Sequence, residues 1–319
     1  MSRKLEFYKT INGLTQKIDG IEDDCWINAV NPTEEEKNFL IKDVGILPEF
    51  IRSSLDDEES PHIDYDDDID QRLIIVDFPI MNQDKDPKDI KMLQYTTAPL
   101  GIISYKKYLI TLSLKENQEL VDFKNGTVKG LNTAMKTRFL FMLMLKISQR
   151  FLLYLRQIDR LSSLTERKLH QSMQNRELIQ MLGLEKSLVF FSTSLKSDEI
   201  IINKLMRGKI VKLYEEDQDL LDDVLIEVHQ AIEMCNIYSN ILSGTMDAFA
   251  SIISNNLNIV MKVLTVITIV MSIPNIIFSF YGMNVKGELP FNLWYIPLII
   301  SIVICIIVTL IFKKKKMFQ

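Results

Sequence analysis

The strongest pattern in the chain is the concentration of apolar residues in its last quarter. Two segments of 23 residues each, Ile259–Tyr281 and Pro290–Phe312, are almost free of charge: the first contains only Lys262 and the second contains none. A helix needs about 20 apolar residues to cross the hydrocarbon core of a bilayer. The alternative, two buried helices of a soluble core, is disfavoured by the uninterrupted second segment. The pattern therefore predicts two membrane-spanning helices.

A polar stripe runs along the first apolar segment and the residues before it. Steps of four and three residues connect polar positions, with one methionine among them: Asp247, Ser251, Ser254, Asn258, Met261, Thr265, Thr268, Ser272, Asn275 and Ser279. An average step of 3.5 residues keeps such positions on one side of a helix in a left-handed bundle. Small hydroxyl residues at this spacing are typical of helix packing in membranes, or of the wall of a water-filled pore. Asn258 and Asn275 favour the pore, because an amide without a hydrogen-bond partner in hydrocarbon costs several kcal/mol.

The second apolar segment has no such stripe. Between Tyr295 and Phe312 it contains two hydroxyl residues, Ser301 and Thr309, and no charge or amide. We therefore expect it to face lipid, outside the first segment. One polar helix cannot enclose a channel by itself, so the pore interpretation requires several copies of the chain around an axis.

The first part of the chain shows a mixed pattern. Runs of β-branched and aromatic residues at 73–78 and 99–114 predict strands, and a polar residue followed by three glutamates predicts a helix start at 31–36. The acidic stretch 56–70 offers the oxygen ligands that a divalent cation prefers, but it lacks EF-hand spacing, which favours a solvated loop. From about 132 to 281, helical spacing of leucine and isoleucine predicts two or three long helices, the last beginning near Ile200.

These patterns divide the chain into six segments. They predict an α/β cytoplasmic domain at 1–131, a long-helix cytoplasmic bundle and stalk at 132–258, a pore-lining transmembrane helix at 259–281, an outer loop at 282–289, a second transmembrane helix at 290–312 and a basic cytoplasmic tail at 313–319. Four lysines, Lys313–Lys316, directly follow the second span. Because basic residues remain on the cytoplasmic side, we expect a multi-pass protein with both termini in the cytoplasm.

Composition and charge exclude several classes of function. The 319 residues carry a formal net charge of -5, which disfavours nucleic acid as a partner. Three cysteines and three histidines are scattered along the chain, so neither a disulfide framework nor a zinc site is expected. The sequence also contains no phosphate-binding P-loop and no Ser/His/Asp or Cys/His catalytic grouping, and we therefore do not expect an enzyme.

The end of the first apolar segment carries a recognisable motif. It reads Tyr281-Gly282-Met283-Asn284, and it is followed by a short loop, a second span and a lysine-rich tail. This arrangement, together with Asn258-Ile-Val-Met-Lys-Val-Leu-Thr265 and Ile273-Pro274, resembles the CorA family of divalent-cation channels. The resemblance implies a funnel-shaped homopentamer with a mixed α/β cytoplasmic domain. It also implies Mg²⁺ as the main substrate, with Co²⁺ and Ni²⁺ often also transported.

The resemblance further implies roles for individual residues. Gly282, Met283 and Asn284 would form the entrance and selectivity filter, with the amide oxygens of Asn284 binding the hydrated ion. The pore would be lined by a series of polar side chains: Asn258, Thr265, Thr268, Ser272, Asn275 and Ser279. Many relatives have threonine at the position of Asn275.

Two further sets of residues would control opening. Met261 and Leu264 would form a hydrophobic gate. Asp247 would bind a regulatory Mg²⁺ together with an acid from the next subunit, either Asp84 or Asp86. Mg²⁺ would thus be both the transported ion and the regulator.

The predicted function is influx of Mg²⁺ across the cell (inner or plasma) membrane, driven by the electrochemical gradient and gated by intracellular Mg²⁺ at subunit interfaces. One alternative is a zinc transporter of the same superfamily, which Met283 disfavours because such relatives commonly carry isoleucine there. The other is a membrane-anchored coiled-coil scaffold, in which the polar stripe serves only to pack helices.

Overall fold

The structure is a computed structural model that describes residues 5–83, 93–172, 175–208, 210–283, 293 and 295–315. Its contacts form two compact units, Met1–Ser243 and Gly244–Gln319. The first unit contains a sheet and a helical bundle, and the second contains two apolar helical segments.

The first unit is built on one mixed sheet of seven strands in the order β2-β1-β3-β7-β6-β5-β4. The strands are β1 (Leu5–Ile11), β2 (Leu14–Ile18), β3 (Trp26–Val30), β4 (His62–Asp66), β5 (Gln71–Gln83), β6 (Leu93–Tyr105) and β7 (Tyr108–Ser113). Among the described strands, β3 and β7 alone pair in parallel, and the long strands β5 and β6 form an antiparallel hairpin. The strands predicted at 73–78 and 99–114 are confirmed, because the first lies in β5 and the second spans β6 and β7.

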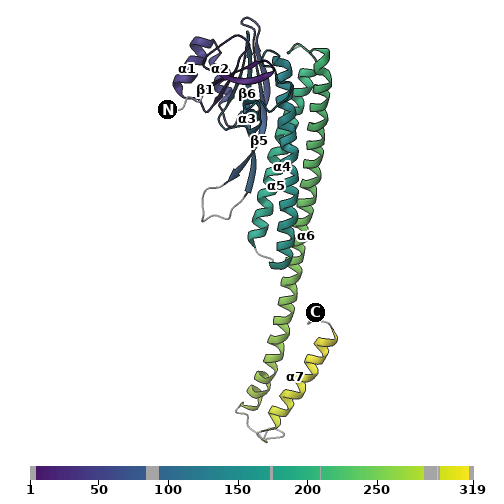
Figure 1. The fold of residues 1–319 in the computed structure, drawn as a ribbon. Coiled ribbons are helices and arrows are strands. Elements are labelled where there is room, and N and C mark those ends of the chain that lie inside the picture. Colours follow the sequence, from purple (N-terminus) through teal and green to yellow (C-terminus); the bar gives the residue numbers. More distant parts are fainter. Residues whose placement is uncertain are drawn as a thin grey trace. The chain divides into compact units, whose positions relative to one another are not determined.

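Helices cover both faces of this sheet (Figure 1). On one face α1 (Glu34–Phe39), a π-helical turn at Leu40–Val44 and α2 (Pro48–Ser54) close a core that contains Leu40, Phe50 and Ile75. On the other face α3 (Gln118–Lys124) and α4 (Lys136–Ser172) enclose Trp26, whose ring lies 5.2 Å from that of Phe139. The sheet is therefore the central layer of an α/β unit, as the sequence predicts.

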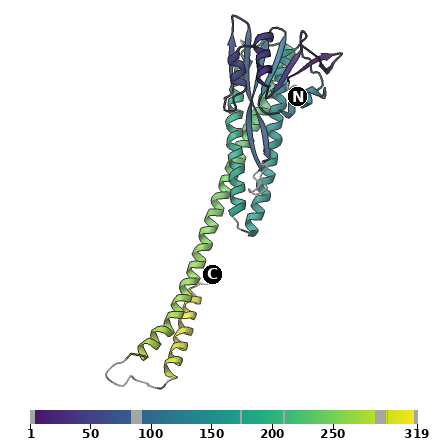
Figure 2. The same ribbon diagram turned by 90° about the vertical axis from the view of Figure 1, so that its left-hand side faces the viewer.

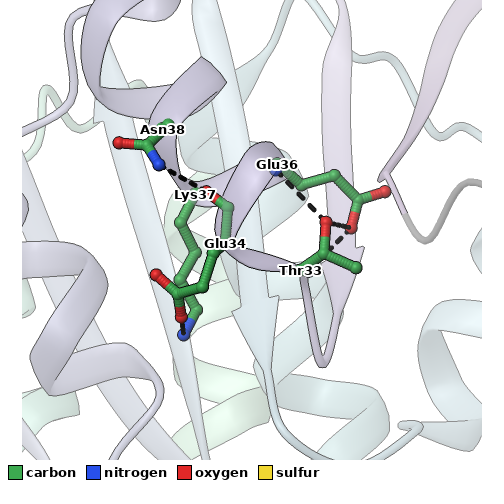
Figure 3. A network of polar contacts seen from close by, with 5 residues as sticks. All are labelled: Thr33, Glu34, Glu36, Lys37 and Asn38. Carbon is green, nitrogen blue, oxygen red and sulfur yellow. Dashed lines mark hydrogen bonds and ion pairs between the residues drawn. The ribbon is translucent and has the colours of Figure 1, made fainter.

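The start of α1 shows how local chemistry sets a helix boundary (Figure 3). Thr33 is the N-cap: its hydroxyl accepts from the backbone N–H of Glu36 at 3.3 Å, and the Glu36 carboxylate accepts from the Thr33 N–H at 2.8 Å. This reciprocal pair satisfies two donors that every helix N-terminus leaves free. Glu36 also accepts from the N–H of Leu5, which ties the helix to β1. The helix start predicted at 31–36 is thus confirmed.

The acidic stretch 56–70 is only in part the loop that its composition predicts. His62–Asp66 forms the edge strand β4, and the turns beside it are closed by carboxylates. The Asp66 carboxylate accepts from the N–H groups of Asp68 and Ile69, at 3.0 and 3.2 Å. Within the described residues, no three His, Cys, Asp or Glu side chains are grouped to hold a metal ion. Asp66 therefore stabilises the turn that follows β4.

Three long helices follow α3, which confirms the prediction of two or three. They are α4, α5 (Asn175–Met206) and α6 (Glu215–Tyr281). The prediction that the last helix begins near Ile200 is wrong, because α5 ends at Met206 and α6 begins at Glu215. Gly208 adopts a φ of +67°, a left-handed conformation that ends helices. Glu215, Glu216 and Asp217 then favour a new N-terminus through the helix dipole.

The long helices of the first unit lie side by side (Figure 2), and the buried positions of α6 follow the alternating steps of a coiled coil. On α6 the buried residues are three and four apart: Leu221, Val224, Val228, Ala231 and Cys235. Such spacing keeps one stripe of a helix against its neighbours. The Cys235 thiol donates to the Leu188 carbonyl of α5 at 3.0 Å, which marks the line of contact between the two helices.

A buried pair of carboxyl groups joins α5 to the sheet. Asp198 of α5 accepts from the N–H of Asp77 in β5 at 3.0 Å, and Ser194 of α5 donates to the Asp77 carboxylate and approaches Thr97 of β6 at 2.8 Å. Burial raises the pKa of Asp77 to about 6 and raises the pKa of Asp198 well above its usual range. Among the described residues, no basic side chain lowers the pKa of either group. The pair is therefore held by hydrogen bonds from the Asp77 N–H and the Ser194 hydroxyl, and burial favours the neutral form of both carboxyl groups.

Candidate functional site

The second unit consists of the end of α6 and of α7 (Ile296–Lys314). Among the described residues these two helices are long and apolar enough to cross a membrane, and only 6% of the most apolar stretch of each is buried. A core helix of a soluble protein would be mostly covered by its own chain. The exposed apolar surface instead fits lipid, which supports the two predicted spans.

One stripe of α6 is covered by α7. Between residues 259 and 281 the partly or fully buried positions of α6, apart from Pro274, recur every three or four residues: Ile259, Val263, Val266, Val270, Ile273, Ile277 and Tyr281. The partly or fully buried positions of α7 include a series with the same spacing, and Ile296 and Ile300 lie next to its first two members: Pro297, Ser301, Cys305, Val308 and Phe312. Val266 and Ser301 are the most completely buried, at 1% and 4% exposed. A small side chain such as that of Ser301 is typical of positions where membrane helices pack against each other.

The polar stripe lies on the opposite side of α6. Thr265, Thr268 and Ser272 are exposed, and each is two positions from a residue that α7 covers. Two positions along an α-helix correspond to a rotation of about 200°. In the single chain α7 leaves this face uncovered. All stripe positions from 258 to 279 are exposed: Asn258, Met261, Thr265, Thr268, Ser272, Asn275 and Ser279.

The hydroxyl groups on this face are oriented by the helix itself. Thr265, Thr268 and Ser272 donate to the carbonyls four residues earlier, at 2.8, 2.9 and 2.8 Å. Each hydroxyl has one proton to donate and two lone pairs to accept with. Because the proton is used within the helix, each oxygen presents acceptor lone pairs outward. The face is therefore a row of hydrogen-bond acceptors.

Pro274 interrupts the backbone hydrogen bonding of α6 directly beside this face. Proline has no N–H, so the Val270 carbonyl four residues earlier loses its normal helical partner. The Cys305 thiol of α7 lies 3.6 Å from that carbonyl and donates a weak hydrogen bond to it. In hydrocarbon a neighbouring helix is the usual way to satisfy such a group. The sequence contains both residues, but nothing in their spacing indicates that they meet.

The end of α6 carries the predicted entrance motif. The N–H of Gly282 donates to the Phe278 carbonyl at 2.9 Å, and that of Met283 donates to the Phe280 carbonyl at 3.3 Å. Gly282 and Met283 are exposed, whereas Asn284 lies outside the described residues. The helix C-terminus carries a partial negative charge, which attracts cations to this end.

The predicted gate and regulatory residues are placed only in part. Met261 and Leu264 are 53% and 55% exposed, and Asp247 is exposed on the polar stripe. Asp84 and Asp86 lie outside the described residues. Within the part of the chain that is described, Asp247 has no metal-binding partners, so a site at Asp247 needs groups from elsewhere.

Sequence comparison decides the family to which this fold and this arrangement of spans belong. Residues 22–314 match the sequence model of the family described as CorA-like Mg²⁺ transporter protein. The chain belongs to this family. The family expected from the sequence is therefore confirmed over residues 22–314, and CorA-family proteins are transporters rather than enzymes.

Individual relatives agree with this assignment. The cobalt/magnesium transport protein CorA of Methanocaldococcus jannaschii is 27% identical over 300 residues, which cover 89% of this chain and 88% of that protein. The complete structure of the CorA magnesium transporter from the same organism has a TM-score of 0.78 at 24% identity, covering 98% of this chain and 97% of that one. The full-length CmaX structure has a TM-score of 0.73 at 17% identity, with 98% of each chain covered. Both structures share the fold of this chain.

Proposed function

We propose that this CorA-family transporter is a homopentameric channel for hydrated Mg²⁺, with Co²⁺ and Ni²⁺ as further substrates, and that the polar stripe of α6 lines its pore. The observation that carries the proposal is the uncovered polar face opposite α7. In one chain this face would meet lipid, where the amides of Asn258 and Asn275 would each cost several kcal/mol without partners. Copies arranged around an axis bring these faces to a shared aqueous path.

The chemistry of the face suits a hydrated cation. Water molecules bound to Mg²⁺ point their hydrogens outward, and Mg²⁺ gives up those waters reluctantly. The hydroxyl oxygens of Thr265, Thr268 and Ser272 offer acceptors, because their protons are used within the helix. Neutral acceptors bind the shell without holding the ion as tightly as carboxylates would. The stripe thus favours movement of the hydrated ion along the pore over tight binding of the ion.

The end of α6 is proposed as the entrance. Asn284 would present amide oxygens to the incoming shell, next to Gly282 and Met283. The C-terminal dipoles of several α6 helices would add negative potential at the same place. A membrane potential that is negative inside supplies a divalent cation with about 4.6 kcal/mol per 100 mV, so influx needs no ATP.

Opening is proposed to depend on the cytoplasmic end of the stripe. Met261 and Leu264 would form a hydrophobic constriction that closes by excluding water. Mg²⁺ bound between Asp247 and Asp84 or Asp86 of a neighbouring subunit would hold the subunits together. When Mg²⁺ leaves, the carboxylates repel each other and the constriction wets. Both chain ends would lie in the cytoplasm and the spans in the cell membrane, since Lys313–Lys316 favour the cytoplasmic side.

Ion flux into liposomes that contain the purified full-length protein tests this function. We expect Mg²⁺ influx driven by an inside-negative potential and inhibited by hexammine cobalt, which has the size and hydrogen-bonding pattern of a hydrated ion. Zn²⁺ in place of Mg²⁺ separates the zinc-transporter alternative, which predicts the stronger flux for Zn²⁺. If correctly assembled protein transported neither Mg²⁺ nor Zn²⁺, this result would favour the scaffold alternative and contradict the channel.

A further inference from the structure

The lysines of the second unit gather at one level of the helix pair. The Cys305–Val270 contact fixes how α6 and α7 lie along each other. Lys262 is eight residues before Val270, and Lys313 is eight residues after Cys305. Because the helices are antiparallel, both displacements run in the same direction and amount to about 12 Å. Lys262 and Lys313 therefore lie at the same height, with Lys314 and Lys315 next to them.

The side chains also converge around the helix pair. Lys262 is four residues before Val266, the α6 residue that α7 covers most completely, so Lys262 is on the side of α6 that faces α7. Lys315 is three residues after Phe312, which α6 partly covers. Helix axes in contact are about 8–10 Å apart, a distance that two lysine side chains from facing helices can bridge through one anion.

No acid in the described part of these helices balances this charge. Lys262, Lys313, Lys314 and Lys315 are all exposed, and none forms an ion pair with a described residue. The nearest carboxylate along α6 is Asp247, fifteen residues before Lys262, a distance of about 22 Å along the helix. The four positive charges are therefore available to an anion from outside these helices.

The surroundings indicate what kind of anion fits. Val260, Leu310 and Ile311 are between 49% and 60% exposed, so the lysines border an apolar surface. Lys262 is about 28 Å along α6 from Tyr281, which places it at one edge of a hydrocarbon core about 30 Å thick. A cation in this position extends its ammonium toward the headgroup layer.

We propose that Lys262, Lys313 and Lys315 form a binding site for the headgroup of an anionic phospholipid in the leaflet where α7 ends. The phosphate accepts hydrogen bonds from lysines of both helices, and the acyl chains cover the exposed apolar residues beside them. The lipid thus joins the two spans at the end opposite their connecting loop. The site is independent of the proposed ion path, which uses the other face of α6.

Native mass spectrometry of the full-length protein in detergent measures this site directly. Phosphatidylglycerol is the probe, and phosphatidylcholine is the comparison lipid. We expect the wild-type protein to retain phosphatidylglycerol in preference to phosphatidylcholine. Lys262→Gln should lower the affinity about fivefold, since each lysine near a lipid surface contributes about that factor. Lys262→Arg should restore most of the affinity, and the triple variant Lys313→Gln/Lys314→Gln/Lys315→Gln should lower it by more than about tenfold.

Control experiments test whether lipid retention depends on these lysines and whether the bound anion is a lipid rather than free phosphate. Lys129→Gln removes an exposed lysine of the α/β unit and should leave lipid retention unchanged. Inorganic phosphate should fail to displace the bound phosphatidylglycerol, because the acyl chains contribute to binding; displacement would point to a free-phosphate site and overturn the lipid assignment. Equal retention of the two lipids, or equal retention of phosphatidylglycerol by wild type and Lys262→Gln, would also overturn it. Mg²⁺ flux, measured separately, tests the channel and not this site.

Discussion

The buried carboxyl pair Asp77–Asp198 makes a quantitative prediction about stability and pH. Asp77 is 8% exposed, and burial raises its pKa from 3.8 to about 6. A raised pKa means that the folded protein binds the proton more tightly than the unfolded chain does. The contribution of Asp77 to stability is therefore fully present below about pH 4 and is lost as the pH rises through about 6. The difference between a pKa of 3.8 and a pKa of about 6 corresponds to about 3 kcal/mol of folding free energy.

The perturbation is Asp77→Asn, which keeps the size of the side chain and an oxygen that accepts from Ser194 but cannot ionise. Near pH 4 the variant and the wild type should have similar stability, because both side chains are neutral. Near pH 8 the variant should be more stable by up to about 3 kcal/mol, since it avoids the buried charge. For a unit of this size that difference raises the unfolding temperature by about 6–12 °C.

The assay is the thermal unfolding temperature of the full-length protein in detergent at the two pH values. Asp219→Asn is the matched control, because it removes an exposed carboxylate from α6, and its difference from wild type should not change with pH. The reasoning is refuted if Asp77→Asn differs from wild type by the same amount at both pH values, or if its advantage is larger at the acidic one.

Three further predictions concern the second unit and the proposed channel. Cys305→Ala leaves the Val270 carbonyl without its thiol partner beside Pro274, and it should destabilise the protein by about 0.5–1 kcal/mol, measured as a lower unfolding temperature in detergent. Cys305→Ser should not have this effect, because serine can donate to the same carbonyl. Equal losses of stability in both variants would contradict the role of this contact. Asn284→Ala should reduce Mg²⁺ flux to the level of empty liposomes while assembly, measured by size-exclusion chromatography, is retained; normal uptake would remove the proposed filter. Asp247→Lys should place a permanent positive charge where regulatory Mg²⁺ is proposed, so flux should no longer respond to Mg²⁺ on the cytoplasmic side, and an unchanged response would refute the regulatory site.

Features with a local repeat could be predicted from the sequence. The spans, the strands at 73–78 and 99–114 and the helix start at Thr33 each depend on residues within a few positions of one another. The polar stripe could also be predicted from the sequence, since its steps of three and four residues define one helix face. What the sequence does not contain is which face α7 covers, because that depends on the packing of the two helices.

Features that depend on distant pairs could not be predicted. Asp77 and Asp198 are 121 residues apart in the chain, and no pattern indicates that they meet. Cys305 and Val270 are also distant in the chain, 35 residues apart, and no pattern indicates that they meet. The break after α5 was missed for a different reason: its marker is a single glycine, Gly208, within a long stretch of helical spacing. The roles of Asn284, Asp84 and Asp86 remain proposals, since these residues lie outside the described part of the chain.

The central claim is that the exposed polar face of α6 lines the ion path, and a matched pair of variants tests it most directly. Thr268 on this face and Thr309 on α7 both donate to the carbonyl four residues earlier, at 2.9 and 2.7 Å, and both are exposed. Replacement of either by valine removes the same hydroxyl at nearly constant volume. In proteoliposomes, Thr268→Val should lower Mg²⁺ influx on the order of tenfold, because the ion's water shell loses an acceptor, and Thr309→Val should leave influx unchanged. Equal influx for the two variants, whether unchanged or reduced, would contradict the claim.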